Sequence, residues 1–325
     1  MKRALLPLLF LAGVALAAGL AIHAGLSGVG AVLAQVGWAG LGLICLIHLA
    51  ALLLCAAGWR CVTDKASFAA CLGARWIRDG SSNLVGFIPA IGEVISARAL
   101  TLLSAETAEA AAAGMVVDVA AETLSQALYA MLGFALLVQH LAPGDAWRWL
   151  AITLVAIVPL LALFAASRNS AVLNWSVAVG ARIARFLGLA SPDAGGGLAA
   201  AIHALQRQPR RVIASTALHL LAWTMGAAQI WALSRGLDHP LSLGDSLILE
   251  SLVYAARAAF FLVPWGAGVQ EGALIAVGAL VGIDAPTAIA LSLALRARDV
   301  VFGAPSLAFW YLAEGRRFWV RRVQT

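Results

Sequence analysis

Residues 38–58 read WAGLGLICLIHLAALLLCAAG, a run without Asp, Glu, Lys or Arg. A helix rises about 1.5 Å per residue, so a run of this length crosses the ~30 Å hydrocarbon core of a bilayer. Apolar runs of comparable length, three of which include charged residues, occupy residues 5–26, 110–141, 147–166, 212–233 and 285–313. They are continuous rather than alternating, which favours helices over barrel strands. The sequence therefore predicts an all-α integral membrane protein with about six full spans.

The composition excludes an ordinary soluble domain. Hydrophobic residues make up 62% of the chain and charged residues only 12%, whereas a soluble domain carries roughly a quarter charged residues. The net charge of +6 comes from 22 basic and 16 acidic side chains. Contact with anionic lipid headgroups explains this excess, and no nucleic-acid recognition motif is present. We expect membrane lipids as partners and no nucleic acid.

The basic residues also predict the orientation. With a cytoplasmic N-terminus, 17 of the 22 fall in segments on the inner side, as the positive-inside rule requires. Both termini are then cytoplasmic. We expect a single polytopic domain over 1–325, with two N-terminal spans in 1–58, a first half in 59–167 and a second half in 212–325. Residues 168–211 form an amphipathic cytoplasmic connector, either on the membrane surface or folded on the protein.

Two further apolar regions, residues 81–105 and 243–282, are broken. Proline must interrupt a helix, and in each region a proline is followed by a glycine and then a glutamate. The predicted helix breaks are Pro89, Gly92, Pro264 and Gly268. Each region forms a re-entrant hairpin or a pair of crossings; residues 81–105 are too few for two crossings, which favours hairpins. The two breaks enter from opposite sides, and interrupted segments in inverted halves point to a transport site near the midplane.

Charged side chains within apolar segments are the candidate site residues, since each costs about 2.5–3.5 kcal/mol on insertion scales. Ten such residues are predicted to bind the substrate: Glu93, Arg98, Asp118, Glu122, Glu250, Arg257, Glu271, Arg296, Arg298 and Asp299.

For each of these charged residues a purely structural role is the alternative to substrate binding. Asp118 and Glu122 lie four residues apart on one helical face, so they either pair with an arginine from a neighbouring helix or serve proton coupling or a cation-lined cavity. The arginines either bind a phosphate or carboxylate or close buried salt bridges. Glu93 and Glu271 follow helix breaks, where they either cap the next helix or belong to a site for an ionic ligand.

Signatures of catalysis are absent from the sequence. It contains no GxSxG, HExxH or Walker A motif and no His/Cys pair at metal-ligand spacing. The four cysteines form no CxxC motif, and buried thiols of this kind usually serve packing. We therefore expect no catalytic residue, no cofactor and no metal.

Several motifs together resemble the lysylphosphatidylglycerol synthase transmembrane (flippase-like) family. In the first half they are Arg75-Trp-Ile-Arg-Asp79 with Asn83, Gly92-Glu93 with Ala97-Arg98, and Val116-Val-Asp118 with Glu122. In the second half they are Glu250, Arg257 to Pro264, Gly268-Val-Gln-Glu271-Gly and Leu295-Arg296-Ala-Arg298-Asp299. The similarity covers roughly residues 60–315 and is strongest to members associated with hopanoid biosynthesis. Trp265 departs from the pattern, which has a glycine after the proline.

The resemblance implies a multi-pass protein of the bacterial inner membrane that handles lipids, as a flippase-like translocator of a polar or hopanoid-type lipid. The alternatives are a membrane-embedded enzyme, or a scaffold for enzymes of lipid (hopanoid) biosynthesis, which would then be partners. The aminoacyl-lipid synthases carry an additional aminoacyltransferase domain. The chain has no room for one before Thr325, so synthase activity is not expected.

Overall fold

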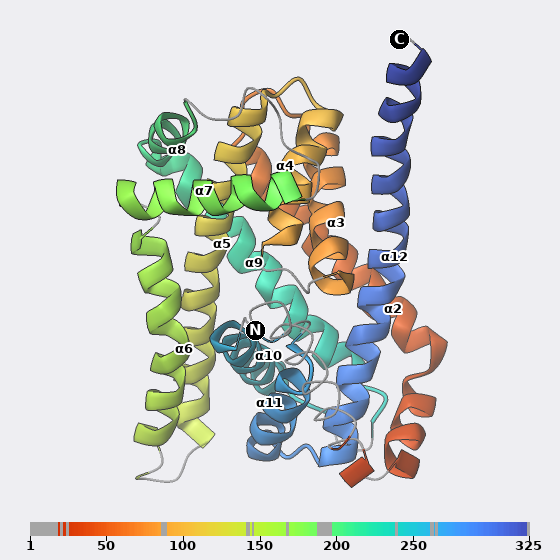
Figure 1. The fold of residues 1–325 in the computed structure, drawn as a ribbon. Coiled ribbons are helices and arrows are strands. Elements are labelled where there is room, and N and C mark those ends of the chain that lie inside the picture. Colours follow the sequence, from red (N-terminus) through yellow and green to blue (C-terminus); the bar gives the residue numbers. More distant parts are fainter. Residues whose placement is uncertain are drawn as a thin grey trace, which may run out of the picture. The chain divides into compact units, whose positions relative to one another are not determined.

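The chain is all-helical wherever its structure is described. The computed structural model describes residues 19, 22–23, 26–85, 90–140, 144, 146–166, 169–186, 197–237, 240–260, 263 and 266–323. These residues form helices joined by turns, without a strand (Figure 1). The prediction of an all-α chain is confirmed.

Eleven α-helices follow one another in the described residues. They are α2 (Leu26–Cys61), α3 (Phe68–Leu84), α4 (Ile91–Leu103), α5 (Ala108–Leu137), α6 (Ala146–Ala166), α7 (Ser170–Phe186), α8 (Leu198–Gln206), α9 (Pro209–Ser234), α10 (Leu243–Ala259), α11 (Val269–Gly278) and α12 (Ala285–Val323). Two short 3-10 helices, η1 (Val138–His140) and η3 (Ala279–Val281), extend α5 and α11.

The apolar runs of the sequence coincide with long helices. The runs 38–58, 110–141, 147–166, 212–233 and 285–313 correspond to α2, α5, α6, α9 and α12. Most of the run 5–26 lies outside the described residues. Among the described helices, α2 and α5 are long and apolar enough to cross a membrane.

Helix α3 has no counterpart among the apolar runs. Its 17 residues include two arginines and an aspartate, and one of its faces is buried. Ser67 begins the helix, because its side chain accepts a hydrogen bond from the Ala70 N–H at 3.2 Å. A search for continuous hydrophobic runs passes over such an amphipathic helix.

Each broken region contains an interruption between two helices in the structure. Gly268 lies at such an interruption, whereas Gly92, predicted as a break, is the second residue of α4. Helix α3 ends before Val85 and α4 begins after Ala90, which has the left-handed φ of 61°. Helix α10 ends before Phe260 and α11 begins after Gly268, whose φ is 76°. Pro89 and Pro264 lie outside the described residues. Whether the segments are re-entrant stays a prediction.

The chain divides into two compact units. Unit 1 consists of Met1–Ala51, Thr123–Phe164 and His219–Arg298, and unit 2 of Leu52–Glu122, Ala165–Leu218 and Asp299–Thr325. The boundaries fall within α2, α5, α6, α9 and α12, so each of these five helices contributes residues to both units. The pair α3–α4 belongs to unit 2 and the pair α10–α11 to unit 1.

Unit 1 has an aliphatic core with an aromatic cluster. Ile230, Leu249 and Leu274 are fully buried in this core, on α9, α10 and α11. In the aromatic cluster the Trp223 ring stacks on Tyr129 at 6.4 Å and meets the edge of Tyr254 at 4.6 Å. This cluster fixes α10 against α5 and α9 within the unit.

Unit 2 is packed around Trp59, Ile77 and Leu100, which lie on α2, α3 and α4 and are fully buried. Helix α8 contributes Ile202 and Leu205 to the same core. Helix α7 contacts α4 and runs across it (Figure 1). The sequence 168–211 therefore folds at least in part against the rest of unit 2.

Close packing of α3 on α12 in unit 2 depends on Gly80. A Cβ at this position would lie 3.0 Å from the Gly303 carbonyl oxygen and 3.1 Å from the Gly303 Cα, and would collide with the Ser306 hydroxyl. We expect Gly80→Ala to lower the free energy of unfolding by about 1–3 kcal/mol through overpacking. The thermal unfolding midpoint of the detergent-solubilised protein measures the loss.

Gly42 in α2 is the control, since a Cβ there would meet nothing within 4 Å. Gly42→Ala should be neutral or stabilise the helix by up to about 1 kcal/mol. Equal midpoints for the two variants would contradict the packing of α3 on α12.

Candidate functional site

The first charged cluster lies in unit 2, where the start of α4 faces α3. Glu93 is the third residue of α4, and Gly92 before it allows the close approach, because a Cβ there would lie 2.8 Å from the Arg78 carbonyl oxygen. The Glu93 Oε1 accepts hydrogen bonds from Arg78 Nη2 at 3.1 Å and Nε at 3.3 Å. The glutamate after the first break is therefore bound to an arginine of the preceding helix.

Glu122 on α5 joins two arginines in the same cluster. Its Oε1 lies 2.7 Å from Arg75 Nη2, and its Oε2 lies 2.7 Å from Arg78 Nη1. One turn earlier on α5, the Oδ2 of Asp118 lies 4.0 Å from Arg75 Nη1 and 3.9 Å from Arg78 Nη1. Of the two alternatives for Asp118 and Glu122, the structure has the pairing with arginines of a neighbouring helix.

The cluster is buried and carries more acids than bases. Asp118 is only 1% exposed, and the Ser215 hydroxyl of α9 donates to its Oδ1 at 3.4 Å. Asp79 pairs with the Arg75 Nε at 2.9 Å. Two guanidinium groups thus face four carboxylates, on Asp79, Glu93, Asp118 and Glu122.

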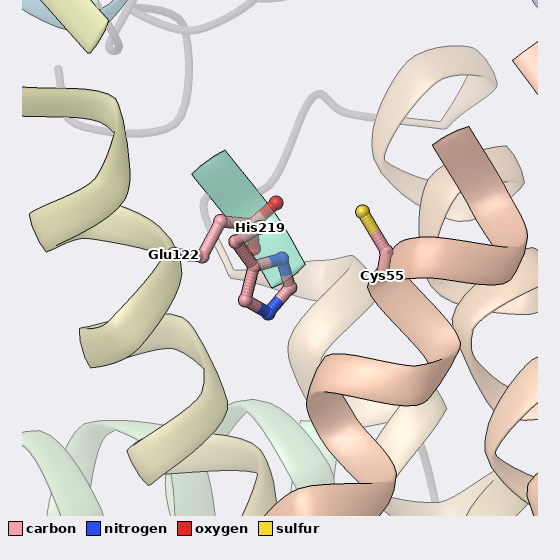
Figure 2. A group of neighbouring side chains, drawn as sticks. All are labelled: Cys55, Glu122 and His219. Atoms are coloured by element: carbon pink, nitrogen blue, oxygen red, sulfur yellow. The ribbon is translucent and has the colours of Figure 1, made fainter. Parts of the chain in front are cut away.

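Cys55 of α2 also lies beside Glu122. Its thiol sulfur and a Glu122 carboxylate oxygen are within 4.8 Å of each other (Figure 2). His219, also drawn in Figure 2, is the first residue of α9 that belongs to unit 1.

The second cluster lies in unit 1, at the start of α11. Glu271 is the third residue of that helix and is only 3% exposed. Its Oε1 accepts from Arg296 Nε of α12 at 2.8 Å, and its Oε2 accepts from Arg296 Nη2 at 3.2 Å. The Oε2 also accepts from the backbone N–H of Gly268 at 2.8 Å. Glu271 is therefore both a cap of α11 and one half of a bidentate ion pair.

A chain of polar side chains extends from this pair toward α10. The Ser292 hydroxyl donates to Glu271 Oε1 at 2.7 Å and accepts from Gln270 Nε2 at 2.8 Å. The Gln270 Oε1 in turn accepts from Arg257 Nη1 at 3.1 Å. The chain links Arg296, Glu271, Ser292, Gln270 and Arg257 in one network of hydrogen bonds.

The other predicted residues have further contacts within the two units. Arg98 of α4 pairs with Glu314 of α12 in unit 2, with Nη2 and Oε1 at 3.0 Å. Arg298 donates to the Gln229 side-chain oxygen of α9 in unit 1. Glu250 is buried against Gly226, where a Cβ would collide with its carboxylate. Asp299 is buried on α12.

The two clusters share a local plan. In each, the glutamate is the third residue of a short helix that begins after a residue with positive φ. Asp118 follows Glu93 by 25 residues, and Arg296 follows Glu271 by 25 residues. Both preceding helices, α3 and α10, have 17 residues and a serine cap. The charges of the two clusters differ, since Asp118 in one cluster takes the position that Arg296 has in the other.

Sequence reasoning missed several members of the clusters. Arg75 and Arg78 lie in a stretch without a continuous apolar run, so a search for charges within apolar segments passes over them. Their spacing in the Arg-Trp-Ile-Arg-Asp motif, with both arginines on one helical face, was the available signal. Gln270, Ser292 and Gln229 are neutral, so a search for costly charges could not find them.

The chain matches one known protein family. Residues 10–305 match the family described as the lysylphosphatidylglycerol synthase TM region. No curated protein and no solved structure matches the chain.

Removing one charge of the unit 2 cluster should destabilise the protein. Glu122→Gln weakens the hydrogen bonds that join Glu122 to both guanidinium groups, while Asp79 and Glu93 still pair with the two arginines, so we expect the free energy of unfolding to fall by about 1.5–3 kcal/mol. Thermal unfolding in detergent measures the loss. The matched control is Asp64→Asn, because Asp64 pairs with Arg211 but its side chain is 70% exposed; it should change stability by less than about 1 kcal/mol. Equal losses would contradict a buried cluster.

Proposed function

The chain belongs to the lysylphosphatidylglycerol synthase TM region family, and we propose that it moves a polar lipid between the leaflets of a bacterial inner membrane. Membership of this family makes it a membrane protein of lipid handling. Translocation, the multi-pass arrangement and a polar or hopanoid-type substrate are the further steps of the proposal. The ten predicted charges would then bind or position the headgroup.

The observation that carries the proposal is the pairing of Glu271 with Arg296 at the beginning of α11. The pair is buried, bidentate and bound to Ser292 and to the Gly268 N–H. A polar headgroup that offers an acceptor to Arg296 and a donor to Glu271 can enter between them. Neither the guanidinium nor the carboxylate is then left unpaired. The acyl chains can meanwhile stay in lipid.

Energetics supports a role for these pairs beyond stability. Replacing a buried ion pair by apolar residues of similar volume is often neutral or stabilising. A fold that only had to hold α11 against α12 would therefore gain little from the ion pair itself, beyond the cap that Glu271 gives α11. The recurrence of a glutamate and arginine pair at Glu93 and Arg78, after the other break, strengthens the inference.

Leaflet exchange in reconstituted vesicles tests the proposal. Fluorescent lipids of several classes, including phosphatidylglycerol and a hopanoid, are incorporated and the accessible fraction is measured by quenching over time. We expect the full chain to speed exchange of at least one class above empty vesicles. Glu271→Gln should slow it at least about tenfold, because a hydrogen bond to a charged group contributes about 1.5–3 kcal/mol.

The control is Asp284→Asn, an exposed acid of unit 1 that caps α12 through the Thr287 N–H at 3.1 Å. It should leave exchange unchanged. An exchange rate equal to that of empty vesicles for every lipid class would contradict the proposal. Conversion of a lipid by the purified protein would favour an enzyme, and co-purification of lipid-biosynthesis enzymes without exchange would favour a scaffold.

A further inference from the structure

Two buried N–H groups of unit 2 lack a hydrogen-bond acceptor among the described residues. The indole Nε1–H of Trp59, on α2, has no partner there, although the side chain is fully buried. The guanidinium of Arg75, on α3, donates from Nη2 to Glu122, but its buried Nη1 has no hydrogen-bond partner. Leaving a buried donor unsatisfied is destabilising, and native structures fill such places with ordered water or a ligand. The two donors therefore mark a place where something binds.

Both donors lie beside the same stretch of α5. Gly114, Asp118 and Glu122 follow one another at four-residue spacing, so they lie on one face of that helix. The Nε1 of Trp59 is 3.7 Å from the position that a Cβ would take at Gly114. The Nη1 of Arg75 is 4.0 Å from Asp118 Oδ2. The two donors thus border the turn of α5 that carries Asp118, one from α2 and one from α3.

Asp118 is the most deeply buried carboxylate of the unit 2 cluster. It is 1% exposed, whereas Asp79 and Glu93 have 23% and 24% of their side chains exposed and are within reach of solvent. Glu122 lies 2.7 Å from each arginine, but the contacts of the arginines with Asp118 are 3.9 and 4.0 Å, longer than hydrogen bonds. Four carboxylates share two guanidinium groups, so a further positive charge is favourable here, and most so at Asp118.

Water suits the two donors and the carboxylate at the same time. A water molecule accepts a hydrogen bond from an N–H group and donates one to a carboxylate, and a buried water typically makes about three hydrogen bonds. A metal cation would be repelled by the guanidinium of Arg75 and by the indole N–H of Trp59. An anion would be repelled by the carboxylates. The positive charge that remains possible is a proton, which water carries to a carboxylate.

We propose that Asp118 binds an exchangeable proton, which it receives from water held by Trp59 and Arg75. In this step one O–H bond of an oxonium ion breaks, an O–H bond forms on a carboxylate oxygen of Asp118, and neutral water remains. The cluster loses one negative charge, while Glu122 stays bound to both arginines. The inference rests on contacts within unit 2 and goes beyond the proposed function, because the proton site exists whether or not lipid crosses the bilayer.

Other titratable groups also face this cluster among the described residues of unit 2. They are Cys55 of α2, Cys71, Arg75, Arg78 and Asp79 of α3, Glu93 of α4 and Glu122 of α5. On α9 the Ser215 hydroxyl donates to Asp118, and His219 follows one turn later on the same helix. A measurement of proton binding must therefore separate a carboxyl group from a thiol, a guanidinium and an imidazole.

Infrared spectroscopy of the full chain in detergent, recorded over a range of pH, makes this separation. Among these groups only a protonated carboxyl has the C=O stretch of a carboxylic acid, and burial separates this band from those of exposed acids. We expect the unchanged protein to have such a band, which shifts in heavy water because the proton exchanges. Asp118→Asn should abolish the band. Asp64→Asn is the control and should keep it, since the Asp64 side chain is 70% exposed.

Replacing Trp59 by phenylalanine tests the part that water plays. Trp59→Phe keeps an aromatic ring but removes the N–H that holds water beside the carboxylate, so the ionised form of Asp118 is stabilised less. We expect the pH at which half of the band remains to rise by about one unit, a tenfold change in proton affinity. Trp175→Phe is the matched control, because Trp175 is 68% exposed on α7, and it should leave this midpoint unchanged.

The proposal is overturned if the band is absent at every pH at which the protein stays folded, or if it persists in Asp118→Asn. Loss of the band in Glu122→Gln alone would assign the proton to Glu122 and overturn it equally. If Asp118→Asn does not fold, Trp59→Phe decides, since a midpoint equal to that of the unchanged protein contradicts the site.

The proton site and the proposed function fail separately. If the band behaves as expected but no lipid exchanges between leaflets, translocation fails and the proton site stands. If lipid exchanges but the unchanged protein has no such band, the proton site fails and translocation stands.

Discussion

A carboxylate and a guanidinium that are both removed from water must face each other, because either one left alone costs several kcal/mol. This constraint governs the two short helices that follow the breaks of the chain. Glu93 at the start of α4, with 24% of its side chain exposed, lies where Arg78 of α3 reaches it, and the buried Glu271 at the start of α11 lies where Arg296 reaches it. The helices that supply the arginines are thereby fixed against the helices that supply the acids.

The same constraint explains why the two clusters differ although their local plan is similar. In unit 2 two arginines serve four carboxylates, and Glu122 accepts from both. In unit 1 Glu271 pairs with Arg296, and Ser292 and Gln270 link this pair to Arg257. A neutral amide and a hydroxyl thus take part in the contacts of unit 1, whereas the contacts of the unit 2 cluster join charged groups directly.

The long helices could be predicted because a continuous apolar run leaves a membrane helix as the simplest structure. The positions of both breaks followed from proline and glycine, and the buried charges followed from their cost in lipid. The partners could not be predicted, since spacing along one helix says nothing of its neighbours. Arg296 pairs with Glu271 of another helix, which the spacing of residues along α12 does not indicate. Hydropathy does not indicate helix α3, because its two arginines and its aspartate interrupt any continuous apolar run.

The central claim is that the pair of Glu271 and Arg296 serves lipid movement as well as stability, and exchanging the two residues tests it most directly. The double variant Glu271→Arg with Arg296→Glu restores an ion pair but places the cation at the start of α11, where the helix end disfavours it. Unfolding midpoint and leaflet exchange are measured on the same preparation. We predict that the midpoint recovers most of what either single variant loses, whereas lipid exchange stays slow. Recovery of both quantities together would contradict the account and make the pair purely structural.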